Sequence, residues 1–406
     1  MLLLAALLLV VVGCSEDDER DALRQKATVE LVPYVSTYAD TEATTDTDSN
    51  ANSNIEPMTR TEMWPPSGYK LYGELTGVNG VLRSNTTAPI AVYFTQGTDR
   101  IHHEDATQPE PPHRFIYNNN IWRIDEEVNS SGSDKYYLYG YIPYNAADPL
   151  ATTISTNSTF DQEAILTLKG LNSVMNQDVC VIVGAQNGMK QGNDIVPIDE
   201  VKTGSFGCEI HAGSENPNYI YLLFDHLYAA LRFQFSVYET YAALRTIKLK
   251  KLELMAYQDE ACQQKMTKKV STTVTLRANT TNSSPIVYAI EFTAEGNEEM
   301  SPVLIYDNES NPVALPTGNE WTESIGFVPK TSSYYLLTST YDVYDKQGNL
   351  IRQNCTADNK INPRKLFQKE SLDRGYMYTM KLLVKPTYLY KLSDPDLDNP
   401  TMVIAD

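Results

Sequence analysis

The sequence predicts an all-β protein with two β-sandwich domains, and three observations lead to this prediction. Apolar and polar residues alternate with a period of two through most of the chain beyond residue 63, as in half-buried strands. The chain holds 27 tyrosines but only 3 tryptophans, and tyrosine suits strands with one wet face. Clusters of Pro, Gly and Asn separate the runs. Many short strands in two groups, within 406 residues, indicate two packed sandwiches.

The first predicted strand is TVELVPYV, residues 28–35. Val29, Leu31 and Val35 share one face, so we expect them to be buried. Pro33 has no N–H to give to a neighbouring strand and therefore predicts a position at the edge of a sheet. Residues 36–54, STYADTEATTDTDSNANSN, hold too few apolar side chains to order themselves and predict a flexible loop.

Further strands of the first sandwich follow beyond residue 63. The runs PIAVYFTQG and KYYLYGYIPY alternate strictly. RFIYNNNIWRI is typical of a hairpin whose turn is made by asparagines, and DVCVIVGA indicates a strand covered on both faces.

A second series of strands runs from YLLFDHLYAALRFQFSV to YMYTMKLLVKP. Within it, RTIKLKKLEL predicts a strand with a bulge at Lys250 and Lys251, preceded by a turn at the start of YETYAALR. KQGN predicts a hairpin turn. Turn formers cluster in SENPNY, so the predicted sandwiches comprise residues 61–217 and 218–406.

The stretch LLVVVGCSEDDE, residues 8–19, predicts a lipoprotein signal. The apolar run of residues 2–12 is about half the length that a helix needs to cross a bilayer, and it fits a secretory signal. Gly13 before Cys14 resembles a bacterial lipobox, in which the peptide of residues 1–13 is removed and the cysteine is lipidated. No Lys or Arg follows Met1, which departs from such signals and indicates a chain start placed too far downstream.

Two alternatives accompany this prediction. An ordinary secretory signal or a short membrane anchor would contain Cys14 by chance. The four acids at residues 16–19 resemble the surface-export tag of Bacteroidetes lipoproteins, and a plain solvated tether is the competing explanation.

The net charge of −19 argues against nucleic acid as a partner, because no basic field exists to neutralise phosphate. It also argues against adhesion to anionic head groups, so a lipid on Cys14 is the predicted membrane link. The other cysteines, Cys180, Cys208, Cys262 and Cys355, allow three pairings and match no zinc template. Cys180 is expected to be a buried thiol, and no bridge is predicted.

The sequence contains no catalytic motif, so we expect no enzyme, no cofactor and no metal. His102, His103 and His113 lie in a Pro-rich, acidic stretch that predicts a solvated loop rather than a metal site. His226 in FDHLYAALRF is expected to be a packed structural histidine rather than a base. The alternating acids of SDPDLDNP resemble calcium ligands, but the missing Gly and terminal Glu favour a surface turn.

Four features together resemble the fimbrillin superfamily of Bacteroidales. They are the lipobox at Cys14, MTRTEMWPPSGY, FDHLYAALRFQF followed by LRTIKLKKLEL, and the closing YLYKLSDPDLDNPTMVIAD. The resemblance spans nearly the whole chain, although each feature alone is weakly specific. It implies two tandem transthyretin-like β-sandwich domains, preceded by a lipidated pro-segment of residues 14–60.

The resemblance also implies a mechanism of assembly. Members of the superfamily reach the outer membrane as lipoproteins, and a maturation protease then cuts after a basic residue. The first strand leaves, and a terminal strand of another fimbrillin subunit fills the groove by strand addition. Arg60 is the only Arg or Lys between residues 26 and 70 and is the best cleavage candidate. Arg24 and Lys26 are the next candidates. They are weaker ones, because cutting there would leave residues 28–35 in place.

The strand that leaves would carry Val29, Leu31 and Val35. The donor would be the C-terminal segment, whose apolar side chains alternate at Tyr388, Tyr390 and Leu392 and again at Met402 and Ile404. This segment equally fits a last strand that folds onto its own domain.

Two functions therefore remain open, besides the less favoured hydrolase on a β scaffold. One is a pilus subunit, in the stalk or at the tip of a surface fimbria. The other is a surface lipoprotein that stays anchored in the outer membrane and binds glycan or a host protein. The fold supports both, because a fold does not fix a function.

Overall fold

The all-β prediction is confirmed by the computed structural model, whose described residues lie mostly in strands and include only two short helices. The described ranges are 25–42, 68–72, 88–96, 112–119, 121–124, 128–130, 133–157, 160–198, 207–213, 216–277, 287–318, 320–330, 334–388 and 395–404. Two tandem transthyretin-like domains are not confirmed by the sheet pairings and stay a prediction.

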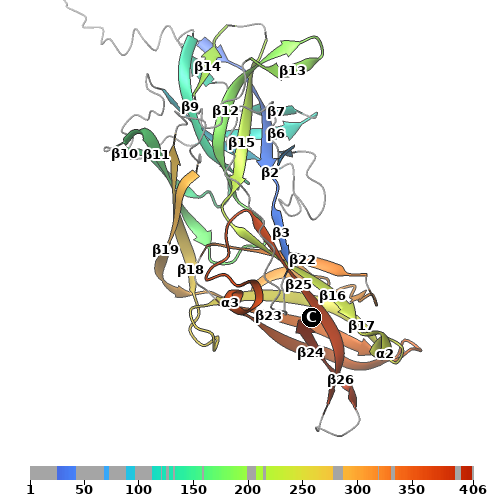
Figure 1. Cartoon of the computed structure of the whole chain (residues 1–406). Coiled ribbons are helices and arrows are strands. Elements are labelled where there is room, and N and C mark those ends of the chain that lie inside the picture. The colour runs from blue at the N-terminus through green and yellow to red at the C-terminus, as the bar shows by residue number, and fades with distance from the viewer. Residues whose placement is uncertain are drawn as a thin grey trace, which may run out of the picture.

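The largest sheet has ten strands and occupies the upper part of the molecule (Figure 1). Because β12 pairs with β9 as well as with β15, the pairing closes on itself. Its strands in spatial order are β13 (Asp194–Pro197), β12 (Cys180–Gln191), β15 (Asn218–His226), β2 (Val29–Ser36), β7 (Ile121–Ile124), β6 (His113–Asn118), β5 (Ile90–Gln96), β9 (Ser133–Ile142) and β14 (Gly207–His211), with β4 (Tyr69–Leu71) against β2.

A four-stranded sheet joins the two halves of the chain. Its strands are β10 (Ala151–Asn157), β11 (Phe160–Asn172), β18 (Thr267–Arg277) and β19 (Val287–Glu299). Their buried side chains belong to the same apolar core as those of the ten-stranded sheet. A separate pair is formed by β1 (Gln25–Ala27) and β8 (Val128–Ser130).

Two five-stranded sheets enclose a second apolar core in the lower part of the molecule. The first contains β22 (Thr322–Val328), β16 (Ala229–Val237), β25 (Tyr376–Tyr388) and β26 (Pro395–Ile404), with β3 (Ala39–Glu42) against β25. The second contains β20 (Val303–Asp307), β17 (Thr246–Tyr257), β23 (Tyr334–Tyr344) and β24 (Leu350–Ile361), with β21 (Val313–Ala314) against β17. The helices are α2 (Glu239–Ala242) and α3 (Pro363–Phe367).

Strands β2 and β3 connect the two cores. In Figure 1 they form a blue path that descends from the upper sheet to the lower one. β2 runs parallel to β15 and antiparallel to β7 and β4, whereas β3 runs parallel to β25. The segment of residues 25–42 is therefore part of both bodies of the molecule.

The predicted edge position of the first strand is wrong, because β2 lies between two neighbours. Pro33 stands between the stretch that pairs with β7 and the stretch that pairs with β4. A residue without an N–H is tolerated where one antiparallel partner ends and the next begins. The predicted loop is likewise wrong for residues 36–42, which finish β2 and form β3.

Several local predictions are confirmed. β6 and β7 form the expected hairpin, with Asn119 in the left-handed region of backbone space. β17 carries the expected bulge between Leu249 and Lys251. The expected turn before it is instead the one-turn helix α2.

Near the predicted division after residue 217, the strand pairing changes between β15 and β16. β15 begins at Asn218 and pairs in the upper sheet with β12 and β2. The pairing changes to the lower sheets only at β16, whose first residue is Ala229. The domain limits as a whole stay a prediction, because β10, β11, β18 and β19 mix strands from both halves.

The C-terminal strand β26 is folded onto its own body. Among the described strands it pairs with β25 alone, opposite Leu382 and Val384, and so lies at the edge of its sheet. Met402 is only 2% exposed and Ile404 packs against the lower core.

The helices among the described residues are too short to span a membrane.

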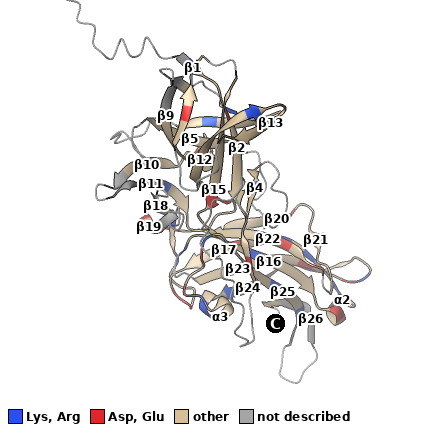
Figure 2. Cartoon of the chain, turned by 45° about the horizontal axis from the view of Figure 1, so that its top comes forward, with Lys and Arg blue, Asp and Glu red and all other residues tan. Residues whose placement is uncertain are grey.

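Charged residues are spread thinly along the strands of both bodies, as the blue and red segments of the ribbon show (Figure 2). In the surface pair of Lys268 with Glu298, the two side chains are 45% and 68% exposed. Such pairs contribute about 0–1 kcal/mol each. The interior pairs at the junction of the two bodies are a different case.

Candidate functional site: a buried polar cluster at the junction

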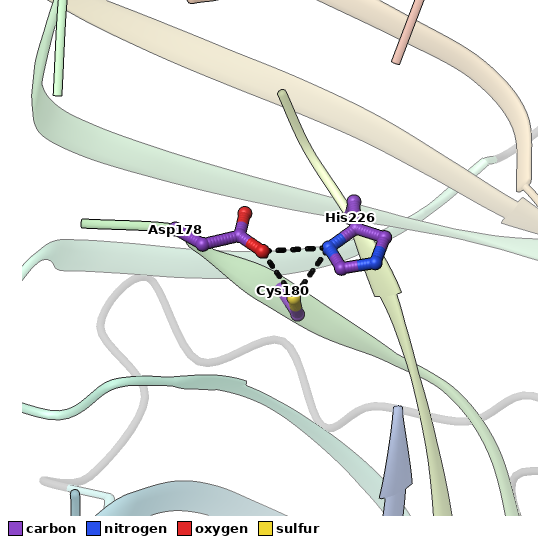
Figure 3. Close-up of side chains that lie close together, drawn as sticks. All are labelled: Asp178, Cys180 and His226. Atoms are coloured by element: carbon purple, nitrogen blue, oxygen red, sulfur yellow. Dashed lines mark hydrogen bonds and ion pairs between the residues drawn. The ribbon is translucent and has the colours of Figure 1, made fainter. Parts of the chain in front are cut away.

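The strand register brings together an aspartate, a cysteine and a histidine at the lower end of the upper sheet. Cys180, at the start of β12, pairs directly with His226, at the end of β15, so their side chains lie on the same face. Asp178 lies two residues before Cys180. All three are 0% exposed and point at one another (Figure 3).

The hydrogen bonds of His226 define its protonation. Nε2 lies 2.6 Å from the carbonyl oxygen of Ser36, which only accepts, so Nε2 carries a proton. Nδ1 lies 2.7 Å from Oδ2 of Asp178 and 3.3 Å from Sγ of Cys180. The contact between Nδ1 and the carboxylate needs a second proton. Because the Asp178 carboxylate raises the pKa of His226, we place that proton on the ring, as an imidazolium paired with Asp178.

The pKa values of this cluster follow from burial and charge. Burial by itself lowers the pKa of His226, but the Asp178 carboxylate and its hydrogen bond outweigh it and raise that pKa above 6.5. Burial, reinforced by Asp178, raises the pKa of the Cys180 thiol. The thiol therefore stays protonated, as the sequence predicts for a buried structural cysteine.

Tyr38 covers the cluster from the segment between β2 and β3. Its ring stacks on the His226 ring with the centroids 3.8 Å apart. Its hydroxyl donates to Oδ1 of Asp178 at 2.9 Å. Burial and Asp178 raise the pKa of this phenol well above its ordinary value, so it remains a donor.

A second acid extends the cluster toward the surface. Oδ1 of Asp225 accepts from the Ser36 hydroxyl at 2.7 Å, and Oδ2 accepts from Arg374 at 2.6 Å. Arg374 also donates to the carbonyl of His226 at 3.1 Å. Burial raises the pKa of Asp225, but Arg374 and Ser36 lower it overall.

Main-chain bonds fix the strap, the name used here for residues 36–40. The N–H of Ala39 donates to Gly375 O at 2.9 Å, and the N–H of Gly375 donates to Tyr228 O at 2.9 Å. Asp40 accepts from Arg232, whose Nε donates to Thr379 at 2.8 Å. The strap thus contacts both the upper and the lower body.

Asp178, Cys180 and His226 are residue types that bind zinc, and their ligand atoms lie within 4.8 Å of one another. The separation of 2.7 Å between Nδ1 and Oδ2 is that of a charged hydrogen bond. Two ligands of one tetrahedral ion with bonds of about 2 Å would stand roughly 3.3 Å apart. The arrangement fits a proton between the two groups better than a metal ion.

The structure accounts for only some of the residues predicted from assembly. Val29 and Val35 are 0% exposed and Leu31 is 3% exposed, so their expected burial is confirmed. Lys26 is exposed in β1 opposite Asn129. Arg24, Arg60 and Cys14 lie outside the described residues. Of the donor candidates, Tyr388 ends β25, Met402 and Ile404 belong to β26, and Tyr390 and Leu392 lie outside the described residues.

Other candidates from the sequence are structural or lie apart from the cluster. His226 is a packed structural histidine, as predicted. His113 is not in a loop but begins β6, edge-on to Phe94 at 5.2 Å between ring centroids. Cys180, Cys208, Cys262 and Cys355 are all free thiols.

The residues that the sequence left unassigned are those of the strap and its acids. Asp178 and Asp225 stand one or two positions from Cys180 and His226, which was the available signal. Ser36 and Tyr38 were hidden in a polar stretch whose composition predicts a loop.

No family model matches the chain, and no curated protein matches it either. Solved structures do. A candidate cell adhesion protein from Bacteroides fragilis is 10% identical, with 93% of this chain and 97% of that chain covered and a TM-score of 0.42. The fimbrial anchor protein of Porphyromonas gingivalis is 8% identical, with 92% and 95% covered and a TM-score of 0.25. A candidate polysaccharide-binding protein from Bacteroides thetaiotaomicron is 8% identical, with 88% and 91% covered and a TM-score of 0.27.

The descriptions of these neighbours name adhesion, fimbrial anchor and polysaccharide-binding proteins. Their identities and TM-scores are too low to transfer a function to this chain. The function proposed below is therefore based on the contacts of the described residues.

The buried groups Asp178, Cys180, His226 and Tyr38, here called the junction cluster, lead to a double-mutant prediction. Asp178→Ala leaves a buried imidazolium without its counter-ion, and we expect a loss of about 3–5 kcal/mol of unfolding free energy. Tyr38→Phe removes one hydrogen bond to a charged group, at about 1.5–3 kcal/mol. The double variant should lose less than the sum, by about 1 kcal/mol, in denaturant titration.

The exposed Glu209→Ala serves as the control and should change stability by no more than about 0.5 kcal/mol. Strict additivity of Asp178→Ala and Tyr38→Phe would show that Tyr38 does not depend on Asp178.

A pH prediction follows from His226. Its folded-state pKa lies above the ordinary 6.5, so its stabilising contribution is complete below 6.5 and is lost as the pH rises through the raised value. We expect the stability advantage of the wild type over His226→Gln to shrink between pH 6 and pH 9.

The titratable groups beside His226 should not reverse this sign. The pKa of Asp225 is lowered, so it stays ionised over this range. The pKa values of Cys180, Tyr38 and Arg374 are raised, so these groups stay protonated. The measurement is the midpoint of thermal unfolding of both proteins across that range. An advantage that grows with pH would contradict the imidazolium assignment.

Proposed function

We propose that the chain is a structural or adhesive subunit of a surface fimbria, exported as an outer-membrane lipoprotein on Cys14. In this proposal a maturation protease cuts after Arg60, β2 leaves the sheet, and a strand of another fimbrillin subunit takes its place. The observation that carries the proposal is the position of β2, which is internal in the sheet and buries Val29, Leu31 and Val35.

The energetics of that position support exchange rather than simple loss. Burying an apolar side chain of this size contributes roughly 1.5–3 kcal/mol. Removal of β2 would take its three buried side chains out of the core and expose the apolar surface that they cover, together with the edges of β15 and β7. A bare sheet edge above an apolar floor recruits another strand, so the cut chain would bind a replacement.

The other end of the chain is compatible with donation. Among the described strands β26 pairs with β25 alone and lies at the sheet edge. It leaves with fewer broken pairings than an internal strand would. Tyr388, Met402 and Ile404 keep their role as donor candidates within this proposal, as do Tyr390 and Leu392.

The second candidate function is a surface lipoprotein that stays anchored and binds glycan or a host protein. The strap favours it, because Ser36, Tyr38 and Asp40 are bonded to both bodies. A segment held in this way suits a chain that keeps its N-terminus. Neither candidate function assigns a catalytic role to the buried cluster of Asp178, Cys180 and His226.

Mass spectrometry of the N-terminus tests the proposal on material sheared from the cell surface. We expect mature chains that begin at Thr61, in ladders that resist boiling in detergent. Arg60→Ala should abolish both the new N-terminus and the ladders. Arg24→Ala is the matched control and should leave them unchanged.

The opposite result is equally clear. Chains that retain an acylated Cys14 and residues 15–60 in the membrane fraction, with no ladders, would contradict the fimbrial proposal and favour the anchored function.

A further inference from the structure

The strap supplies polar groups that an apolar strand would not. Ser36 brings a carbonyl to Nε2 of His226 and a hydroxyl to Asp225. Tyr38 brings a ring to His226 and a hydroxyl to Asp178.

Asp40 completes the set by accepting from Arg232 at 3.1 Å. The five contacts fall on alternate residues, because residues 36, 38 and 40 share one side of an extended chain. The strap thus presents a hydroxyl, a phenol and a carboxylate in a fixed order.

If residues 25–60 left, the side chains that bond to the strap or to its partners would stay in the body. Asp178 and His226 are 0% exposed, and Asp225 and Arg374 are 22% and 27% exposed. Buried charged groups that lose a partner are strongly destabilising. A replacement strand that offers only apolar alternation would fill the place of β2 and leave these groups unsatisfied.

We propose that the groove vacated by β2 selects a strand in which apolar alternation is followed by Ser or Thr, any residue, Tyr, any residue, and Asp or Glu. The proposal rests on the strand exchange proposed above and names its partner. Tyr is required at the middle position because the same side chain must stack on His226 and donate to Asp178.

Once residues 1–60 have left, the rest of this chain cannot supply that strand to a copy of itself. The pattern occurs once in the 406 residues, at Ser36-Thr37-Tyr38-Ala39-Asp40. The C-terminal segment, PTYLYKLSDPDLDNPTMVIAD, does not contain it. The occupant of the groove is therefore a strand of a different polypeptide, and the chain joins an assembly of unlike subunits.

The test uses the full chain with a recognition sequence for a site-specific protease inserted between Arg60 and Thr61. After cleavage, synthetic peptides of residues 28–42 are added in excess, and the exchange of the N-terminal fragment is followed by mass spectrometry of the gel-filtered protein. Variant peptides carry Ser36→Ala, Tyr38→Phe or Asp40→Asn. A peptide with Thr41→Ala is the matched control, and a peptide of residues 386–406 represents the chain's own C-terminus.

We expect the wild-type and Thr41→Ala peptides to replace the fragment equally well. Tyr38→Phe should bind about 10- to 100-fold more weakly, because one bond to a buried carboxylate is lost. Ser36→Ala should bind about tenfold more weakly. Asp40→Asn should have a smaller effect, because the Asp40 side chain is 52% exposed, although its partner Arg232 is 11% exposed. The 386–406 peptide should not bind measurably.

Two different results would overturn the inference. Exchange of all peptides with similar affinity, the C-terminal one included, would refute the polar selection while leaving strand exchange intact. Retention of the cut fragment against every peptide would refute strand exchange itself, and the inference with it.

Discussion

The ion pair between His226 and Asp178 is the constraint on which the junction depends. Both side chains are fully buried, and a buried charge is tolerated only when it is paired and its other hydrogen-bonding atoms are satisfied. Two of the remaining hydrogen bonds come from Ser36 and Tyr38, which are 190 and 140 positions away in the chain. The strap is ordered because the pair requires it, and the pair is tolerable because the strap is present.

This mutual dependence gives the N-terminal segment two kinds of attachment. Along β2 the attachment is apolar and repetitive, through Val29, Leu31 and Val35, and any alternating strand of suitable size could provide it. Along the strap it is polar and specific, through hydrogen bonds to charged groups. The first kind supplies affinity and the second discriminates between occupants. Both functions proposed for the chain use the same contacts and differ in whether the segment is kept.

The pattern of apolar and turn-forming residues predicted the features that depend only on residues close together in the sequence. Alternation identified β2 and its buried face, the asparagines identified the β6–β7 hairpin, and the apolar run around Cys180 identified a covered strand. It failed where partners distant in sequence decide the outcome. Pro33 led to the prediction of an edge strand, because the sequence does not show that β2 changes its antiparallel partner beside this residue. Ser36 and Tyr38 predicted a loop because their partners, Asp225 and Asp178, lie 189 and 140 residues away.

Hydrogen exchange of the intact, uncut chain tests most directly whether the strap and β2 are integral to the body. The amides of β2 and of its parallel neighbour β15 are compared by mass spectrometry of their peptic fragments. The account predicts that both strands are protected to a similar degree, within about tenfold, because they open in one cooperative unit. Exchange of β2 many orders of magnitude faster than β15, while β15 stays protected, would contradict it.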